Sequence, residues 1–151
     1  MPKLIGIATH AYSSAAIDEH SAIYISQSSG LENDFQGAKC AETAVTLLSN
    51  KTWQSVCQTL STNIDWTELR ANLLIDRMDF STASLGEMIE IGEVILRVTA
   101  ETNPCKRMDQ LFKGLTLELS PEWRGGVRCQ VVRSGWVHLN NTIRIITPNK
   151  A

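Results

Sequence analysis

Two tight connections between strand-like segments constrain the fold of this chain more than any other feature of its sequence. Gly92-Glu93 opens with a glycine and suits a type II′ hairpin turn. Asn140-Asn141 suits a type I′ turn, because asparagine tolerates the positive φ angles that this turn needs. Each connection therefore predicts a β-hairpin. The strand-like runs that they join are 88–91 with 94–99, and 136–139 with 142–146.

Other short apolar or alternating runs extend the strand pattern along the chain, to a total of about seven strands. Short strands joined by tight turns are typical of a closed or nearly closed barrel, which also removes exposed sheet edges. The chain has 151 residues and no internal repeat or linker-like tract, so we expect one domain over residues 1–151. The expected fold is thus mainly β, a barrel with two or three short helices. The additional strand-like runs are 4–8, 22–26, 44–48 and 127–132.

Helical spacing is clearest after the run at 44–48. One face of a predicted helix is formed at i, i+3, i+4 and i+7 by Trp53, Val56, Cys57 and Leu60. Ser49 or Asn50 is suited to its N-cap. Cys57 is therefore expected to be buried and inert.

Composition and charge exclude several classes of function. Net charge is −2 and the basic residues are scattered, so no nucleic-acid surface is expected. The first eleven residues do not have the pattern of a secretory signal, and no apolar run approaches the ~20 residues of a membrane helix. We therefore expect a cytoplasmic protein with no membrane partner.

The cysteines and histidines do not form a metal-site motif. There is no C-x-x-C pair, so free thiols are expected, with Cys129 packed in the core on the apolar side of a strand. The three histidines have no ligand spacing and are interpreted as solvent-exposed. They are His10, His20 and His138.

Cys105 stands out among the thiols because of its neighbours. It follows a predicted strand, and the apolar residues from 105 to 115 recur at helical spacing. Pro104 suits the first helical position, and Lys106 and Arg107 follow directly. A helix N-terminus and adjacent cations lower a thiol pKa, so we expect Cys105 to be largely thiolate. It is a candidate nucleophile, sulfur carrier or metal ligand; the alternative is a cysteine that only packs a strand-to-helix corner.

Several short motifs follow one another along most of the chain, from about residue 30 to the C-terminal strands. They are Gly30-Leu31 with Asp34, Val45-Thr46-Leu47-Leu48-Ser49, Leu69-Arg70 with Asn72-Leu73, Leu85-Gly86 with Ile91-Gly92, Val98-Thr99 leading to Pro104-Cys105, Gly126-Val127, and Gly135. Their order resembles the MOSC domain, the small β-barrel module named for the C-terminal region of molybdenum cofactor sulfurases. The likeness is greatest to the stand-alone bacterial, YiiM-like members of this family.

The chain departs from the family pattern in two places. Asn33 replaces the glycine before Asp34, and Thr43-Ala44 stands where an Arg-Gln pair is common. The second change removes a basic group that would bind an anionic ligand such as a cofactor phosphate. Other basic residues are candidates to replace it, namely Arg70, Lys106, Arg107, Arg124 and Arg128.

The resemblance implies a domain that carries sulfur on a cysteine or binds the molybdenum cofactor (molybdopterin). Cys105 would be the persulfide carrier or the molybdenum-ligating thiolate, beside Lys106 and Arg107 as cofactor-binding cations. Arg70 would bind an anionic group, Asn72 would hydrogen-bond to the ligand or a loop, and Asp34 would orient the cofactor or a loop. The alternative is that Arg70 and Asn72 tie the connections of the barrel together, and that Asp34 caps a turn.

Three functions follow from these assignments. The first is a sulfur-carrier or cofactor-binding module, which would receive sulfur from a partner such as a pyridoxal-phosphate-dependent cysteine desulfurase. The second is a molybdenum-cofactor-dependent reductase of N-hydroxylated compounds, which would need an external electron-transfer protein. The third is a non-catalytic β-barrel that binds a small ligand or a partner, with Cys105 incidental.

Overall fold

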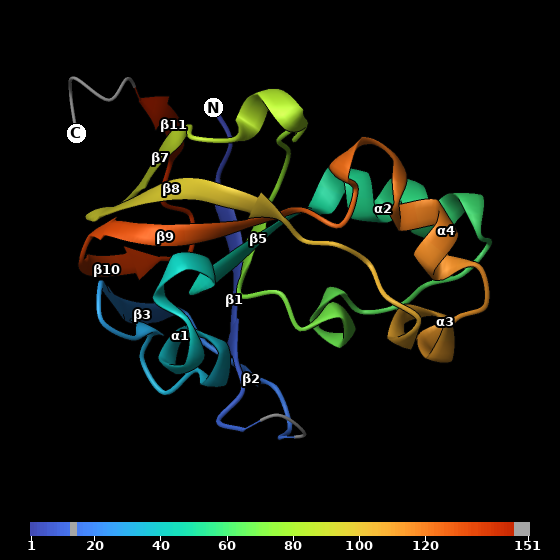
Figure 1. The fold of residues 1–151 in the computed structure, drawn as a ribbon, viewed down its shortest axis with the longest axis horizontal. Coiled ribbons are helices and arrows are strands. Elements are labelled where there is room, and N and C mark those ends of the chain that lie inside the picture. Colours follow the sequence, from blue (N-terminus) through green and yellow to red (C-terminus); the bar gives the residue numbers. More distant parts are fainter. Residues whose placement is uncertain (13–14, 147–151) are drawn as a thin grey trace.

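The computed structural model describes residues 1–12 and 15–146 (Figure 1). Its strands form one sheet in the order β11-β7-β8-β9-β5-β6-β1-β2 and a smaller sheet in the order β10-β3-β4. The strands are β1 (Leu4–Thr9), β2 (Asp18–Glu19), β3 (Ala22–Ser26), β4 (Gly30–Leu31), β5 (Val45–Ser49), β6 (Leu73–Ile75), β7 (Met88–Ile91), β8 (Val94–Glu101), β9 (Val127–Arg133), β10 (Gly135–His138) and β11 (Ile143–Ile146).

Short helices fill the connections, and they outnumber the two or three that the sequence predicts. The α-helices are α1 (Phe35–Lys39), α2 (Asn50–Thr59), α3 (Arg107–Leu111) and α4 (Leu115–Leu119), and the 3-10 helices are η1 (Ala41–Thr43), η2 (Trp66–Leu69), η3 (Thr82–Ser84) and η4 (Pro121–Trp123). Figure 1 shows α2, α3 and α4 together at one end of the large sheet, with α1 on the other side. None of the helices in the described ranges is both long enough and apolar enough to cross a bilayer.

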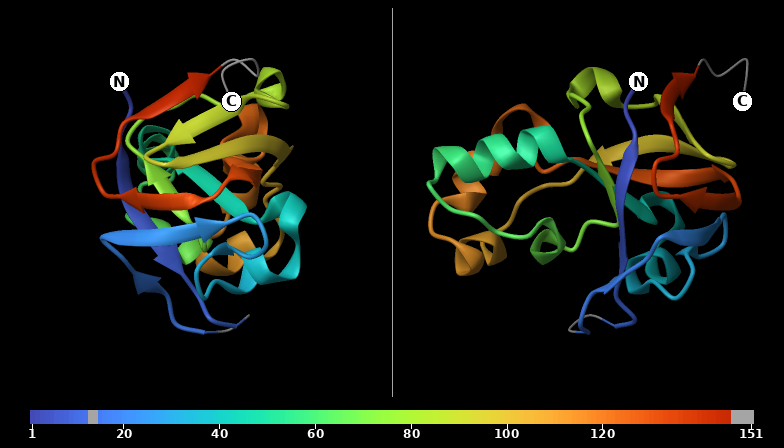
Figure 2. Two further views of the ribbon diagram at one scale, coloured as in Figure 1. Left: turned by 90° about the vertical axis from the view of Figure 1, so that its left-hand side faces the viewer. Right: turned by 180° about the vertical axis from the view of Figure 1, so that it is seen from behind.

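The main core lies between the two sheets. Ile23 and Ile25 from β3 and Val137 from β10 pack in one buried cluster with Leu4 of β1 and Leu47 of β5. The alternation of apolar and polar residues that marks these runs in the sequence is thus the alternation of inner and outer faces. Figure 2 shows how the large sheet curls around this core.

Neither sheet closes into a barrel, so the predicted closure is not confirmed. The large sheet is open, with β11 and β2 as its outer strands, and the segment of β10 pairs only with β3. The apolar periodicity correctly indicates strands and a buried face. It does not specify which strand pairs with which, because pairing depends on segments distant in the sequence.

Of the two predicted hairpins, one forms. Ile91 of β7 lies opposite Val94 of β8, and Gly92 has a φ of +55°. The second prediction is wrong, because β10 pairs with β3 whereas β11 pairs with β7. Asn140 has the expected positive φ of +74°, but its N–H donates to Leu4 O at 2.7 Å, so this turn binds β1 and passes the chain from one sheet to the other.

The predicted helix over residues 50–60 is confirmed as α2. Ser49 is its N-cap and accepts a hydrogen bond from Thr52 N. Trp53, Val56 and Cys57 are buried in a second apolar cluster, against α4 and the ends of β5 and β6. This packing holds α2 and α4 against the end of the large sheet at which β8 ends and the Cys105 segment begins.

Candidate functional site

Cys105 lies in the connection from β8 to α3, and its side chain is exposed. The helix begins at Arg107, later than the sequence suggests, and it contains only five residues. The single predicted helix is divided because Gly114, with a φ of +94°, separates α3 from α4. Cys105 therefore precedes a short helix instead of lying in its first turn, and the helix dipole stabilises a thiolate there less than the sequence suggests. The thiol is accessible, as expected.

The backbone of Cys105 is held in place by the helical segment that follows it. Its carbonyl accepts hydrogen bonds from Met108 N at 2.9 Å and from Thr116 Oγ1 at 2.7 Å. Asp109 accepts a hydrogen bond from Thr116 N, and this bond lowers the pKa of the Asp109 carboxyl. A reachable sulfur is thus carried by a fixed backbone.

Two buried polar atoms near the Cys105 segment have no partner in the part of the chain that the structure describes. They are Thr102 Oγ1 and Arg128 Nε. Thr102 N donates to Gly126 O at 3.0 Å, and Arg128 on β9 lies opposite Ala100 at the end of β8. A buried donor without an acceptor costs about 1–3 kcal/mol. These atoms therefore favour an acceptor supplied from outside the chain.

The side chain of Asn72 makes three hydrogen bonds within the chain. Its Oδ1 accepts hydrogen bonds from Thr46 N at 3.0 Å and Thr46 Oγ1 at 3.1 Å. Its Nδ2 donates to Ala8 O at 3.2 Å, and the side chain is buried. Asn72 thus links β1 to β5 beside β6. Its amide holds these strands together instead of pointing toward a ligand.

Arg70 is only partly occupied. It adopts a left-handed φ of +61° at the end of η2, a conformation uncommon for a residue with a side chain. Its Nη2 donates to Ala15 O at 2.8 Å. Its Nε is buried and has no partner among the described residues, so Arg70 resembles Arg128 in having an unused donor.

Asp34 has a structural role that the sequence suggests only as an alternative. The helix α1 follows it directly, and Asp34 is the N-cap that accepts a hydrogen bond from Gly37 N. Its Oδ1 also accepts from His10 N at 3.1 Å and lies 3.6 Å from His10 Nδ1. The carboxylate therefore holds the end of β1 against α1.

His10 is buried, contrary to the interpretation of all three histidines as solvent-exposed. Burial lowers the pKa of His10, the nearby Arg70 charge lowers it too, and Asp34 opposes these effects. The surroundings therefore favour the neutral imidazole. No motif indicated this burial, because His10 is covered by residues more than twenty positions away.

The other thiols divide into buried and exposed ones. Cys57 and Cys129 are buried as predicted, and burial raises the pKa of the Cys129 thiol. Cys40 is exposed, and a hydrogen bond with the Thr43 side chain, together with backbone N–H groups, lowers its pKa. The sequence did not distinguish Cys40, so any test of Cys105 must resolve the two exposed thiols.

The predicted site residues fall into separate groups. Asp34 contacts His10, and the charge of Arg70 lowers the pKa of His10. Asn72 instead forms hydrogen bonds with Thr46. Lys106 and Arg107 are exposed neighbours of Cys105 along the chain. No hydrogen bond within the described residues joins Cys105 to Arg70, Asn72 or Asp34, and these residues contain no group of three His, Cys, Asp or Glu that could hold a metal.

An open β fold with an accessible cysteine after its longest strand defines a thiol-bearing β domain. A family model described as "MOSC domain" matches residues 10–144. The chain belongs to the MOSC domain family, which confirms the resemblance seen in the motifs.

Comparison with solved structures gives the same fold. YuaD from Bacillus subtilis has a TM-score of 0.73 at 15% identity, over 95% of this chain and 94% of that one. YiiM from Escherichia coli has a TM-score of 0.68 at 14% identity, over 96% and 70%. YiiM from Geobacillus stearothermophilus has a TM-score of 0.75 at 9% identity, over 97% and 76%. A search of curated protein sequences found no match.

Proposed function

We propose that this MOSC domain binds a molybdopterin-type cofactor beside Cys105, with the thiolate of Cys105 as the protein ligand to the metal. The observation that carries the proposal is a pair of buried polar atoms without partners among the described residues, Thr102 Oγ1, just after β8, and Arg128 Nε, on the neighbouring strand β9. A cofactor phosphate accepts several hydrogen bonds, and arginine is well suited to bind one. Bound there, the cofactor would supply a redox-active metal centre.

The residues present fit such a group in two respects. A soft thiolate suits a sulfur-rich metal centre, and Cys105 is an exposed thiol. Arg128 lies opposite Thr46, and η1, which includes Thr43, packs against β9. Arg128 thus supplies positive charge close to where the usual family arginine is absent. In this proposal Asn72 and Asp34 shape the surroundings through their internal hydrogen bonds.

A second candidate, sulfur carriage on Cys105, is favoured by the open position of this residue. Cys105 is exposed and is followed by two exposed cations, Lys106 and Arg107, so a partner can reach its sulfur. The Cys105 thiolate would attack the outer sulfur of a donor persulfide, such as one on a cysteine desulfurase. The donor S–S bond breaks, a new S–S bond forms on Cys105, and the donor cysteine leaves as a thiolate, so no net redox change is needed.

One preparation separates these functions. The protein is purified from a host that makes molybdenum cofactor, and molybdenum, pterin fluorescence and intact mass are measured. We expect roughly equimolar molybdenum in the wild type, its loss in Cys105→Ser, a decrease in Arg128→Met, and no change in the matched control Cys40→Ser.

Each result supports or contradicts a specific statement. Molybdenum retained by Cys105→Ser would contradict ligation by this thiol. A sulfur adduct on Cys105 without molybdenum would replace the first proposal with sulfur carriage. A protein with neither would leave both proposals without support and favour the non-catalytic alternative. The proposed reductase activity toward N-hydroxylated compounds requires the molybdenum-containing outcome and an added electron donor.

A further inference from the structure

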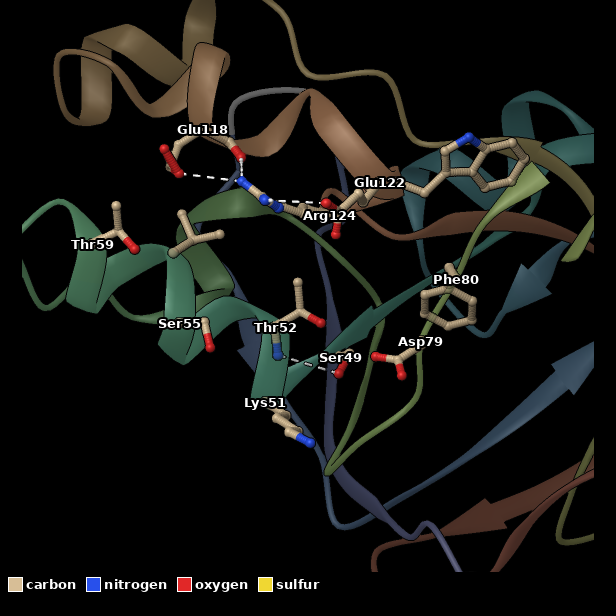
Figure 3. A pocket seen from close by; sticks show the side chains of 12 residues that line it. Ser49, Lys51, Thr52, Ser55, Thr59, Asp79, Phe80, Glu118, Glu122 and Arg124 are labelled. Atoms are coloured by element: carbon tan, nitrogen blue, oxygen red, sulfur yellow. Dashed lines mark hydrogen bonds and ion pairs between the residues drawn. The ribbon is translucent and has the colours of Figure 1, made fainter. Parts of the chain in front are cut away.

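A polar cavity of about 370 Å³ lies beside α2 (Figure 3). Its walls come from α2, from the segment Glu118–Arg124 and from Asp79-Phe80. Cavities of this size accommodate small organic molecules. The cavity walls include Arg124, one of the basic residues considered above for anion binding, but not Cys105, Arg70 or Arg128. The ligand inferred below therefore does not depend on the function proposed above.

Ser49 gives the first indication of what this cavity binds. Its side chain is buried, with 2% of the residue surface exposed. Its Oγ accepts hydrogen bonds from Thr52 N at 3.4 Å and Met78 N at 3.2 Å, which use both of its lone pairs. The hydroxyl hydrogen has no acceptor in the described residues. Because Ser49 lines the cavity (Figure 3), a ligand with a hydrogen-bond acceptor would complete its bonding.

The charges around Ser49 favour a carboxylate as that acceptor. Lys51 lies at the same end of α2, lines the cavity and has no ion-pair partner among the described residues. Asp79 also lines the cavity close to Ser49 (Figure 3). One cation and one carboxylate leave little net charge, so this end suits a singly charged carboxylate better than a dianionic phosphate.

The far end of the cavity has the opposite preference. Arg124 Nη1 lies 3.2 Å from Glu118 Oε2, and Arg124 Nη2 lies 3.7 Å from Glu122 Oε1. Two carboxylates around one guanidinium leave a surplus negative charge, which favours an amine. Glu122 and Trp123 have left-handed φ angles of +56° and +53°, and such strain is concentrated at ligand sites.

The length of the cavity along α2 indicates the size of the ligand. Thr52, Ser55 and Thr59 line the cavity on one face of α2, and the seven steps from Thr52 to Thr59 correspond to about 10 Å at 1.5 Å per residue. A ligand lying along this face has room for more than one amino-acid residue, because consecutive Cα atoms are only about 3.8 Å apart. Phe80 adds aromatic surface near the Ser49 end (Figure 3), which suits an apolar side chain there.

We infer that this cavity binds a short peptide of dipeptide size. Its free carboxylate is placed at Ser49 and Lys51, its free amine at Glu118 and Glu122, and its apolar side chain against Phe80. The ligand is therefore recognised by both termini, and the hydroxyl row of α2 faces its backbone.

Isothermal titration with three probes tests this inference. Glycyl-leucine carries both charges, N-acetylglycyl-leucine lacks the amine, and glycyl-leucinamide lacks the carboxylate. A charge-assisted hydrogen bond contributes about 1.5–3 kcal/mol, so removing either charge is expected to weaken binding roughly 10-fold or more. Equal binding of the three probes, or no binding of glycyl-leucine at about 10 mM, would overturn the inference.

Exposed positions provide variants that keep the fold intact. Lys51→Gln is expected to weaken glycyl-leucine about 10-fold while leaving glycyl-leucinamide unchanged, because only the free carboxylate needs the ammonium. Glu122→Gln should weaken the probes with a free amine. Lys113→Gln, an exposed lysine outside the cavity, is the matched control. Loss of binding in the control as well, or none in Lys51→Gln, contradicts the assigned orientation.

Discussion

Replacing Asn72 with alanine is expected to destabilise the fold strongly. The change removes three hydrogen bonds and leaves two backbone groups, the buried Ala8 O and the part-buried Thr46 N, without this partner. A buried group without a partner costs about 1–3 kcal/mol, so the free energy of unfolding should fall by about 3 kcal/mol. Urea unfolding followed by tryptophan fluorescence measures this change.

The matched control is Asn103→Ala, since Asn103 is exposed on the Cys105 segment. It should alter the free energy of unfolding by less than about 0.5 kcal/mol. A double-mutant cycle with Thr46→Val should give a coupling energy of about 1 kcal/mol, because the side chains of Asn72 and Thr46 bond to each other. A loss below about 1 kcal/mol for Asn72→Ala would refute the role of this amide as a tie between strands.

Two further predictions concern a turn and a cap. Gly126 has a φ of +90°, and a Cβ there would collide with Leu47 O, so Gly126→Ala should cost more than about 3 kcal/mol in urea unfolding. Gly86→Ala has a similar φ of +83° but open space, and should cost only about 1 kcal/mol; equal losses would show that the collision is relieved. Hydrogen bonds from Thr67 lower the pKa of Asp65. Its contribution to stability is present above the unfolded pKa of about 3.9 and is lost as pH falls through the lower folded pKa, so Asp65→Asn should flatten the acid limb of stability against pH. An unchanged acid limb would contradict this.

Local features of the fold were predictable because they depend on neighbouring residues. The apolar spacing from Trp53 to Leu60, with a serine before it, is enough to indicate α2 and its Ser49 cap. Gly92 likewise indicates the hairpin of β7 and β8, because the turn and the strands that it joins are adjacent in the sequence.

Features that depend on distant partners were not predictable in this way. Asn140 has the backbone conformation of a hairpin turn, but contacts with Leu4 place its flanking strands in different sheets. The helical spacing after Cys105 continues through residues 112–114, whereas Phe112 is extended and Gly114 ends the periodicity. Periodicity indicates which residues are buried, but not which element buries them.

The sequence by itself determined the chemistry that is available here: a cysteine between a predicted strand and basic residues, in an order of motifs typical of the MOSC family. Only the tertiary structure decided that Cys105 is exposed, that Asn72 and Asp34 are occupied within the chain, and that Arg70 and Arg128 have unused buried donors. The physical reason is that exposure and hydrogen-bond satisfaction depend on atoms brought together from distant segments, whereas thiol and guanidinium chemistry belongs to each residue alone.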